Sequence, residues 1–267
     1  MKTDSPPPCI FEKHDRISYS NIGSTGHLKI VSILNYLQDA ASEHAYLMGA
    51  SGFDLATQNL AWVISRYELI LLDNPDWQEE ICIKTWRTPW KNLYEIRQFS
   101  ITGKQDRPIL DARAAWVMVK RENSRPVRLS RFLPETSWEN QAGPLVAPQE
   151  LFSDLGVPAR CDFSLPFKIR MHDLDLNGHV NNAIYVEWAV ETVPESMLSA
   201  FSPNHVRVSF HRESFYGDGI ISITEIIEHP QHPETVHAIT RKDGNVELAR
   251  VSIRWKPMDR NGGHHVR

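Results

Sequence analysis

The chain has 267 residues, of which 41% are hydrophobic and 23% charged, and its formal net charge of −4 argues against a general nucleic-acid binder, which normally has a basic balance. This length allows one large domain or two smaller ones, each with a buried core. The sequence has no apolar run of about 18 residues and no apolar signal segment at its start, so we expect a cytoplasmic protein that does not cross a membrane. The three cysteines, Cys9, Cys82 and Cys161, are far apart and predict free thiols.

The first part of the chain predicts one helix followed by four strands. Apolar residues recur at helical spacing over residues 30–48, and Gly49 is suited to end that helix. Strand-like segments follow at residues 61–72, 80–88, 93–102 and 110–120.

A stretch with little periodicity separates this part from the rest. Residues 135–160 are rich in Pro, Gln, Glu and Gly, which is typical of a linker. We therefore predict an N-terminal domain (residues 1–134), a linker (135–160) and a C-terminal domain (161–267). Residues 261–267 are expected to form a short disordered tail.

The second part predicts the same series of elements. A strand over 162–171 is followed by a helix over 180–193, which Pro194 ends, and by strands over 205–213, 219–227, 235–241 and 246–255. An offset of 152 residues lays Gly26-His27-Leu28 over Gly178-His179-Val180. The chain therefore contains two copies of one domain.

Polar side chains precede the second helix. Asp175, Asn177 and His179 occupy five positions just before it, where free N–H groups and the helix dipole stabilise developing negative charge. In the first copy Gly23 and Thr25 replace the acid and the amide, so we expect one active centre, in the second half. Helix capping or an Asx turn is the alternative role for the acid and the amide, and a purely structural role is the alternative for the histidine.

Two metal-site patterns in this region are incomplete. The run from Asp173 to Gly178 copies the start of an EF-hand loop, but its twelfth position is Ile184, which supplies no carboxylate. A mixed site built from His172, Asp173 and His179 stays open by spacing alone, although it lacks two closely spaced histidines.

The motif Asp-x-Asn-x-His-Val-Asn-Asn that begins at Asp175, together with the Glu in the Ser-Phe-His-Arg-Glu segment that ends at Glu213, resembles the active-site signature of the acyl-acyl-carrier-protein (acyl-ACP) thioesterases of plant plastids and their bacterial relatives. The resemblance covers about residues 9–256. It implies an α+β fold, the tandem hotdog, in which each half wraps a curved antiparallel sheet around one long helix. In plant members a Cys follows the Glu, whereas this chain has Ser214, so a thiol nucleophile is not supported.

The same resemblance implies hydrolysis of fatty acyl-ACP thioesters without a metal or an organic cofactor. We expect Asp175 to act as nucleophile or general base, Glu213 to activate water, and Asn177 and His179 to position and polarise the substrate. The first half would then shape the acyl pocket, which would be lined by Trp62, Trp86 and Trp116. The alternatives are an acyl-CoA thioesterase and a non-catalytic acyl-binding protein of the same fold.

The expected partner is acyl carrier protein, with no nucleic acid and no membrane, and the sequence is compatible with a homodimer. Carrier proteins are acidic, so a local basic surface would attract them. The segment 113–131 has one acid, Glu122, among the following basic residues: Arg113, Lys120, Arg121, Arg125, Arg128 and Arg131. A solvated loop is the alternative for this segment.

Overall fold

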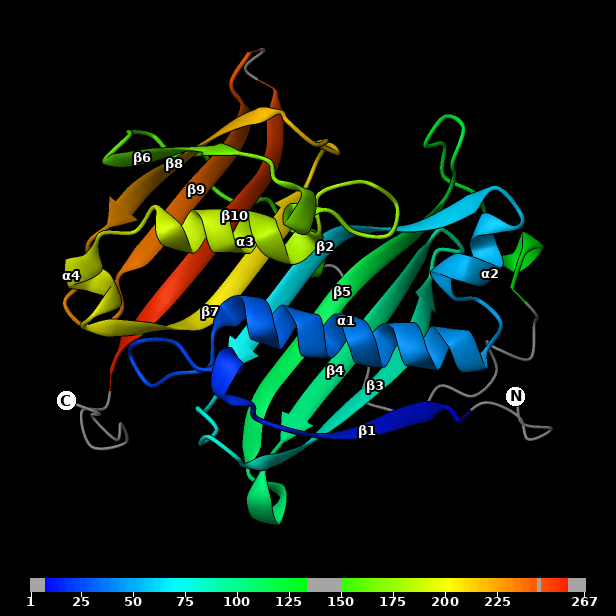
Figure 1. The fold of residues 1–267 in the computed structure, drawn as a ribbon, viewed down its shortest axis with the longest axis horizontal. Helices are drawn as coiled ribbons and strands as arrows, with labels where there is room; N and C mark the ends of the chain where they lie inside the picture. Colours follow the sequence, from blue (N-terminus) through cyan, green and yellow to red (C-terminus); the bar gives the residue numbers. More distant parts are fainter. Residues whose placement is uncertain (1–7, 134–149, 244–245, 259–267) are drawn as a thin grey trace.

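One antiparallel sheet of ten strands runs through both halves of the computed structural model, which describes residues 8–133, 150–243 and 246–258 (Figure 1). The first half contains β1 (Ile10–Arg16), α1 (Ile30–Leu47), α2 (Gly52–Ala56), β2 (Leu60–Leu71), β3 (Glu80–Trp90), β4 (Tyr94–Thr102) and β5 (Pro108–Lys120). The second half contains β6 (Phe163–Lys168), α3 (Asn182–Glu191), α4 (Glu195–Leu198), β7 (Phe201–Phe210), β8 (Gly219–Ile227), β9 (Glu234–Arg241) and β10 (Glu247–Pro257). Short 3₁₀ turns include η3 (Leu129–Arg131), η5 (Glu150–Phe152) and η6 (Met171–Asp173).

The strand order repeats between the halves. It reads β1-β3-β4-β5-β2 and then, from the other edge, β6-β8-β9-β10-β7, so corresponding strands take corresponding places. The halves are joined where β2 pairs with β7 over residues 66–70 and 205–209. The duplication predicted from the sequence is therefore visible in the topology.

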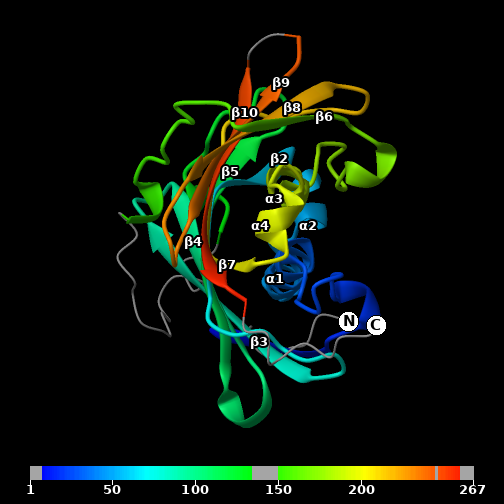
Figure 2. The same ribbon diagram turned by 90° about the vertical axis from the view of Figure 1, so that its left-hand side faces the viewer.

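Helices α1 and α3 lie side by side on one face of the sheet (Figure 2). Helix α1 buries one apolar stripe, with Leu37 fully enclosed, and α3 is apolar on most sides, with Val186 fully enclosed. Burying each such side chain contributes roughly 1.5–3 kcal/mol, which fixes both helices on the sheet. No helix in the described ranges has the length and apolar character needed to cross a bilayer.

Two predicted boundaries around the polar cluster are wrong. Helix α3 begins at Asn182 rather than at residue 180, because the side chain of Asn181 accepts a hydrogen bond from the amide of Ala183 (3.0 Å) and caps the helix there. Strand β7 ends at Phe210 rather than at residue 213, so Glu213 lies in a loop. The ladder ends because two successive amides, those of His211 and Arg212, both donate to the carbonyl of Leu248.

The described end of the predicted linker packs on the face of the sheet opposite the helices (Figure 2). Leu151 in η5 is buried against Ile96 and Ala115, and Arg207 on β7 donates to the carbonyl of Ser153 (3.1 Å). Residues 134–149 of the linker and the predicted disordered tail, 261–267, lie outside the described ranges.

Candidate active site

The polar cluster lies on a tight loop between η6 and α3. The amide of Asp175 donates to the carbonyl of His179 (2.7 Å), and the amide of Gly178 donates to the carbonyl of Asp175 (3.0 Å). Gly178 has a φ of +77°, a left-handed conformation that glycine adopts without steric strain. The loop is therefore closed by its own backbone.

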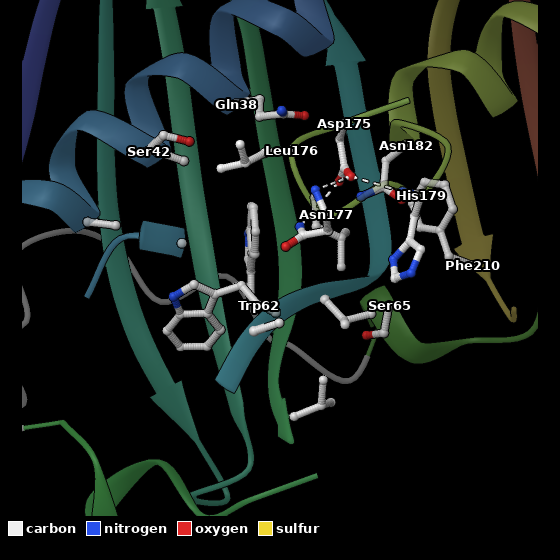
Figure 3. A pocket seen from close by; sticks show the side chains of 18 of the residues that line it. Gln38, Ser42, Trp62, Ser65, Asp175, Leu176, Asn177, His179, Asn182 and Phe210 are labelled. Carbon is white, nitrogen blue, oxygen red and sulfur yellow. Dashed lines mark hydrogen bonds between the residues drawn. The ribbon is translucent and has the colours of Figure 1, made fainter. Parts of the chain in front are cut away.

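The side chains of Asp175 and Asn177 are held in a short chain of hydrogen bonds (Figure 3). Oδ1 of Asp175 accepts from the amides of Asn177 (2.8 Å) and His179 (3.3 Å), and Oδ2 accepts from Nδ2 of Asn177 (3.4 Å). Oδ1 of Asn177 accepts from Nη1 of Arg121, which follows β5 in the first half (3.1 Å). Because the arginine can only donate, the amide oxygen must face it and the amide nitrogen must face the carboxylate.

His179 faces the loop that follows β7. Its Nδ1 lies 3.5 Å from Oε1 of Glu213, and both side chains are about one-third exposed. The ring of Phe215 meets the imidazole edge to face, with 5.1 Å between the ring centroids. The carbonyl of Glu213 accepts from Arg241 (3.3 Å). The imidazole and the carboxylate are thus neighbours that solvent and a ligand can reach.

Ser214, at the position where plant members have a cysteine, lies in the protein interior and makes structural contacts. It is fully buried, its hydroxyl is hydrogen-bonded to the hydroxyl of Tyr185 (2.6 Å), and its carbonyl accepts from the amide of Val180 (3.2 Å). Burial raises the pKa of Tyr185 to about 12, so its phenol stays protonated at neutral pH. Ser214 therefore fastens the Glu213 loop to α3.

All four predicted site residues line one cavity of about 1020 Å³, which extends between α1 and the sheet of the first half. Trp62 (Figure 3) and Trp116 also line it, as predicted. Trp86 does not, because it alternates along β3 with the buried Thr85 and Arg87 and so faces the other side of the sheet. The volume is at the upper end of the usual range for small-molecule sites.

The first half repeats the loop without its chemistry. The amide of Gly23 donates to the carbonyl of His27 (2.8 Å), and Gly26 has a φ of +78°, as in the second half. The ring of His27 contacts only the carbonyl of Thr25 among the hydrogen bonds in the described residues (3.1 Å). His27 does not line the cavity.

Charged side chains that sequence reasoning missed lie in the cavity wall. Glu95 and Arg97 on β4 are each 3% exposed, and Nη2 of Arg97 lies 3.1 Å from Oε1 of Glu95. Nη1 of Arg97 lies 3.1 Å from Nδ1 of His44 on α1. Burial, together with the charge of Arg97, lowers the pKa of His44 to about 3, so this imidazole is neutral. The available signal was that both charges fall on the side of β4 that also carries Phe99 and Ile101.

The residues left open as a mixed metal site are not gathered around one ion. Asp173 is buried and bonded to Arg170, with 2.7 Å between Nη2 and Oδ1, and His172 is exposed. Elsewhere in the described residues, ligand atoms of Glu12, His14 and Cys82 lie within 4.8 Å of one another on the β1–β3 pair. Lys84 already forms an ion pair with Glu12 there (3.0 Å).

The basic segment divides into two parts. Arg113 is buried and forms an ion pair with Glu68, so it does not belong to a surface patch. The remaining basic side chains are exposed, namely Lys120, Arg121, Arg125, Arg128 and Arg131. Arg121 contacts the polar loop, and Ser124 lines the cavity, so this part of the segment lies beside the cavity.

Comparisons with known proteins agree with this geometry. Residues 8–134 match the family model described as the acyl-ACP thioesterase N-terminal domain, and residues 158–257 match the acyl-ACP thioesterase C-terminal domain. Among curated proteins, a chloroplastic dodecanoyl-[acyl-carrier-protein] hydrolase of Cinnamomum camphora is 26% identical over 94% of this chain and 69% of its own length. A chloroplastic palmitoyl-acyl carrier protein thioesterase of Gossypium hirsutum is 24% identical over 93% of this chain and 64% of its own length.

Solved structures show the same fold. The 12:0-ACP thioesterase from Umbellularia californica has a TM-score of 0.84, with 21% identity, 94% of this chain covered and 95% of that one. An acyl-ACP thioesterase from Bacteroides thetaiotaomicron has a TM-score of 0.78, with 21% identity, 92% of this chain covered and 98% of that one. The predicted fold is therefore confirmed. The two family models together span most of the sequence, and the chain belongs to the acyl-ACP thioesterase family of thioester hydrolases.

Proposed function

We propose that this protein hydrolyses fatty acyl-ACP to a free fatty acid and the carrier protein, with its active centre at the Asp175 loop. The observation that supports this most is the shared cavity: two carboxylates, an amide and an imidazole lie at a cavity with volume for a long ligand. The chemistry is undemanding, because a thioester carbonyl is already reactive. A positioned base contributes about 100- to 10,000-fold, and one donor to the developing oxyanion about 100- to 1,000-fold.

In this proposal Asp175 acts as nucleophile or general base and Glu213 activates water. The base takes a proton from water, and the water oxygen attacks the thioester carbonyl. The carbon–sulfur bond then breaks, and the sulfur takes up a proton as the carrier protein leaves as a thiol. Asn177 and His179 position the carbonyl and stabilise negative charge on its oxygen. The contact of 3.5 Å between His179 and Glu213 supports their action as a pair.

The repeated loop argues against a merely structural role for the acid. Asp175 does accept hydrogen bonds from its own loop, as a capping residue would. The first half, however, forms the same backbone turn with Gly23 in that position. The carboxylate is therefore not needed for the turn. This supports a second-half centre, with the first half (residues 1–134) shaping the acyl pocket.

For the carrier protein we propose the exposed basic segment beside the cavity as the docking surface. Arg121, Arg125 and Arg128 would attract an acidic partner, and the contact of Arg121 with the loop supports their closeness to the centre. The plant relatives are chloroplastic proteins. We retain the cytoplasm as the proposed location of this chain and a homodimer as compatible with it.

The test is a hydrolysis assay over acyl-ACP and acyl-CoA thioesters of matched chain lengths. We expect turnover of acyl-ACP with a higher kcat/KM than of the matched acyl-CoA. Faster turnover of acyl-CoA would favour an acyl-CoA thioesterase. Tight binding of acyl chains with no hydrolysis of either series would leave the non-catalytic binding protein as the function.

A further inference from the structure

A row of polar side chains on α1 lines the cavity. Gln38, Ser42 and Tyr46 follow one another at intervals of four residues, so they lie on one face of the helix. Ser42 and Tyr46 are exposed and Gln38 is half-buried, so solvent and a ligand reach all three. Figure 3 shows the amide of Gln38 extending from α1 toward Asp175, with Ser42 farther along the helix.

These three side chains are free to bind a ligand. In the part of the chain that the structure describes, none of them takes part in a hydrogen bond or an ion pair. Their neighbour Glu43 also lines the cavity, but it is ion-paired with Lys13 on β1. The row is therefore neutral, and each of its groups both donates and accepts hydrogen bonds.

Apolar side chains line the more enclosed part of the same cavity. Ala41 and Ala45 on α1 and Ile64 on β2 are buried there, and Trp62 and Trp116 lie beside them in the wall. An acyl chain gains free energy among such side chains, whereas an amide or a hydroxyl loses it unless it finds a partner. The exposed polar row therefore suits the part of the substrate on the other side of the thioester.

We propose that Gln38, Ser42 and Tyr46 bind the pantetheine arm through which ACP, like CoA, carries its acyl group. The arm contains two amides and a hydroxyl, and each of these groups can pair with an amide or a hydroxyl of the row. The inference rests on the proposed function, since it concerns the thiol side of the same substrate.

The row has the length that the arm requires. A helix rises about 1.5 Å per residue, so Gln38 and Tyr46 are about 12 Å apart along the axis of α1. Between the thioester sulfur and the hydroxyl-bearing carbon the arm has about nine bonds, which span about 10 Å when extended, like three residues of backbone. Gln38 points toward Asp175, so it pairs with the amide nearer the sulfur. Ser42 and Tyr46 pair with the second amide and the hydroxyl.

The far end of the row leads toward the basic segment proposed as the docking surface. Tyr46 lies near the end of α1, and α2 follows with Phe53 in the cavity wall. Just after α2, the carbonyl of Asn59 accepts from the amide of Arg121 (2.9 Å). Ser124 of the basic segment also lines the cavity. The arm would therefore run from the Asp175 loop toward the side where the carrier protein docks.

The experiment compares three thioesters of one fatty acid, with pantetheine, N-acetylcysteamine and ethanethiol. N-acetylcysteamine retains only the amide nearer the sulfur, and ethanethiol has neither amide nor hydroxyl. We expect kcat/KM for the pantetheine thioester to be at least about 10-fold higher than for the ethanethiol thioester, with the N-acetylcysteamine thioester between them, because each lost partner removes a hydrogen bond.

Three variants assign the hydrogen bonds to residues. Gln38→Met keeps the length of the side chain and should reduce the preference for both amide-containing thioesters over the ethanethiol thioester by about 3- to 10-fold. Ser42→Ala combined with Tyr46→Phe should lower kcat/KM for the pantetheine thioester alone. Asn35→Leu is the matched control, since Asn35 is exposed on α1 without lining the cavity, and should preserve every ratio.

Binding of free pantetheine, measured by calorimetry, gives a readout that does not depend on turnover, and it should weaken at least about 3-fold in Gln38→Met and in the double variant. Equal kcat/KM for the three thioesters would overturn the inference while leaving the thioesterase proposal intact. A preference for pantetheine that survives in both Gln38→Met and the double variant would also overturn it. No turnover of any thioester, acyl-ACP included, would count against the proposed function instead, and the calorimetry would then decide whether the row binds the arm.

Discussion

The guanidinium of Arg121, at the end of β5, donates to the side-chain oxygen of Asn177 in the other half of the molecule (3.1 Å). This contact turns the amide nitrogen of Asn177 toward Asp175. The first half therefore supplies a positioning residue to the proposed active centre, in addition to the walls of the pocket.

Arg121→Met should lower kcat by about 10-fold, because the amide of Asn177 loses the partner that fixes its orientation. Arg121→Lys, which can still donate a hydrogen bond, should retain part of the kcat that Arg121→Met loses. Arg125→Met is the matched control, since it removes a nearby exposed charge without touching the loop. Steady-state kinetics distinguish the orienting role of Arg121 from a general effect of positive charge. A fall in kcat for Arg125→Met as large as that for Arg121→Met would show that only the charge matters.

Asp175→Asn should lower kcat by at least about 100-fold with little change in the free energy of unfolding, because it keeps the shape and removes the charge. Glu213→Gln should have a comparable effect, and the double variant should be much less than multiplicatively worse. If Asp175 only caps the turn, Asn does so equally well, and turnover within a few-fold of the wild type would show it.

His27→Ala should change stability or acyl binding more than kcat, because the first-half loop lacks the acid and the amide. Turnover and thermal unfolding of the variant are measured side by side. Complete loss of turnover in a folded protein that still binds acyl chains would contradict a single centre.

Arg125→Glu combined with Arg128→Glu should raise KM for acyl-ACP, and more at low salt than at high salt, because screening weakens attraction between exposed charges. Titration of substrate at two ionic strengths checks this. An unchanged KM at low salt would remove this segment as the docking surface.

Stability should fall in mild acid. Burial lowers the pKa of His237 to about 3, and burial with Arg97 does the same for His44, whereas the ordinary value is about 6.5. The folded state disfavours protonation of these two histidines. The stability that their neutral forms contribute is therefore fully present above about pH 6.5 and is lost as pH falls toward 3. Between about pH 8 and pH 5, each histidine should lower the free energy of unfolding by about 2 kcal/mol, which urea unfolding measures. His237→Gln should show a smaller decrease over that range.

Much of the fold was predictable because the local pattern repeats. Both helices and every strand proposed from periodicity occur, and the Gly-His pairs aligned the two copies. Glu213 was placed in a strand because apolar alternation continues to Phe210, and nothing local reveals that His211 and Arg212 share one carbonyl. Long-range contacts, such as that between Arg121 and Asn177, have no local signature.

The four residues proposed for the site lie at one cavity, and two of the three tryptophans expected to line it do so, whereas the buried charges of its wall were not predicted. Asp175, Asn177 and His179 are close in sequence, so a motif could identify them. Glu95 and Trp116 become neighbours only when β4 and β5 pair. Trp116 was expected in the pocket, whereas the only local sign of Glu95 was a charge on the buried side of a strand.

Gly23 has ample room for a side chain. A Cβ added there would have its nearest contacts at 3.6 Å, from the carbonyl of His27 and the side chain of Lys29. Steric hindrance therefore does not explain why the first copy lacks a carboxylate. The duplicated turn remains a usable template, onto which Gly23→Asp and Thr25→Asn would graft the acid and the amide of the second copy without rebuilding the backbone.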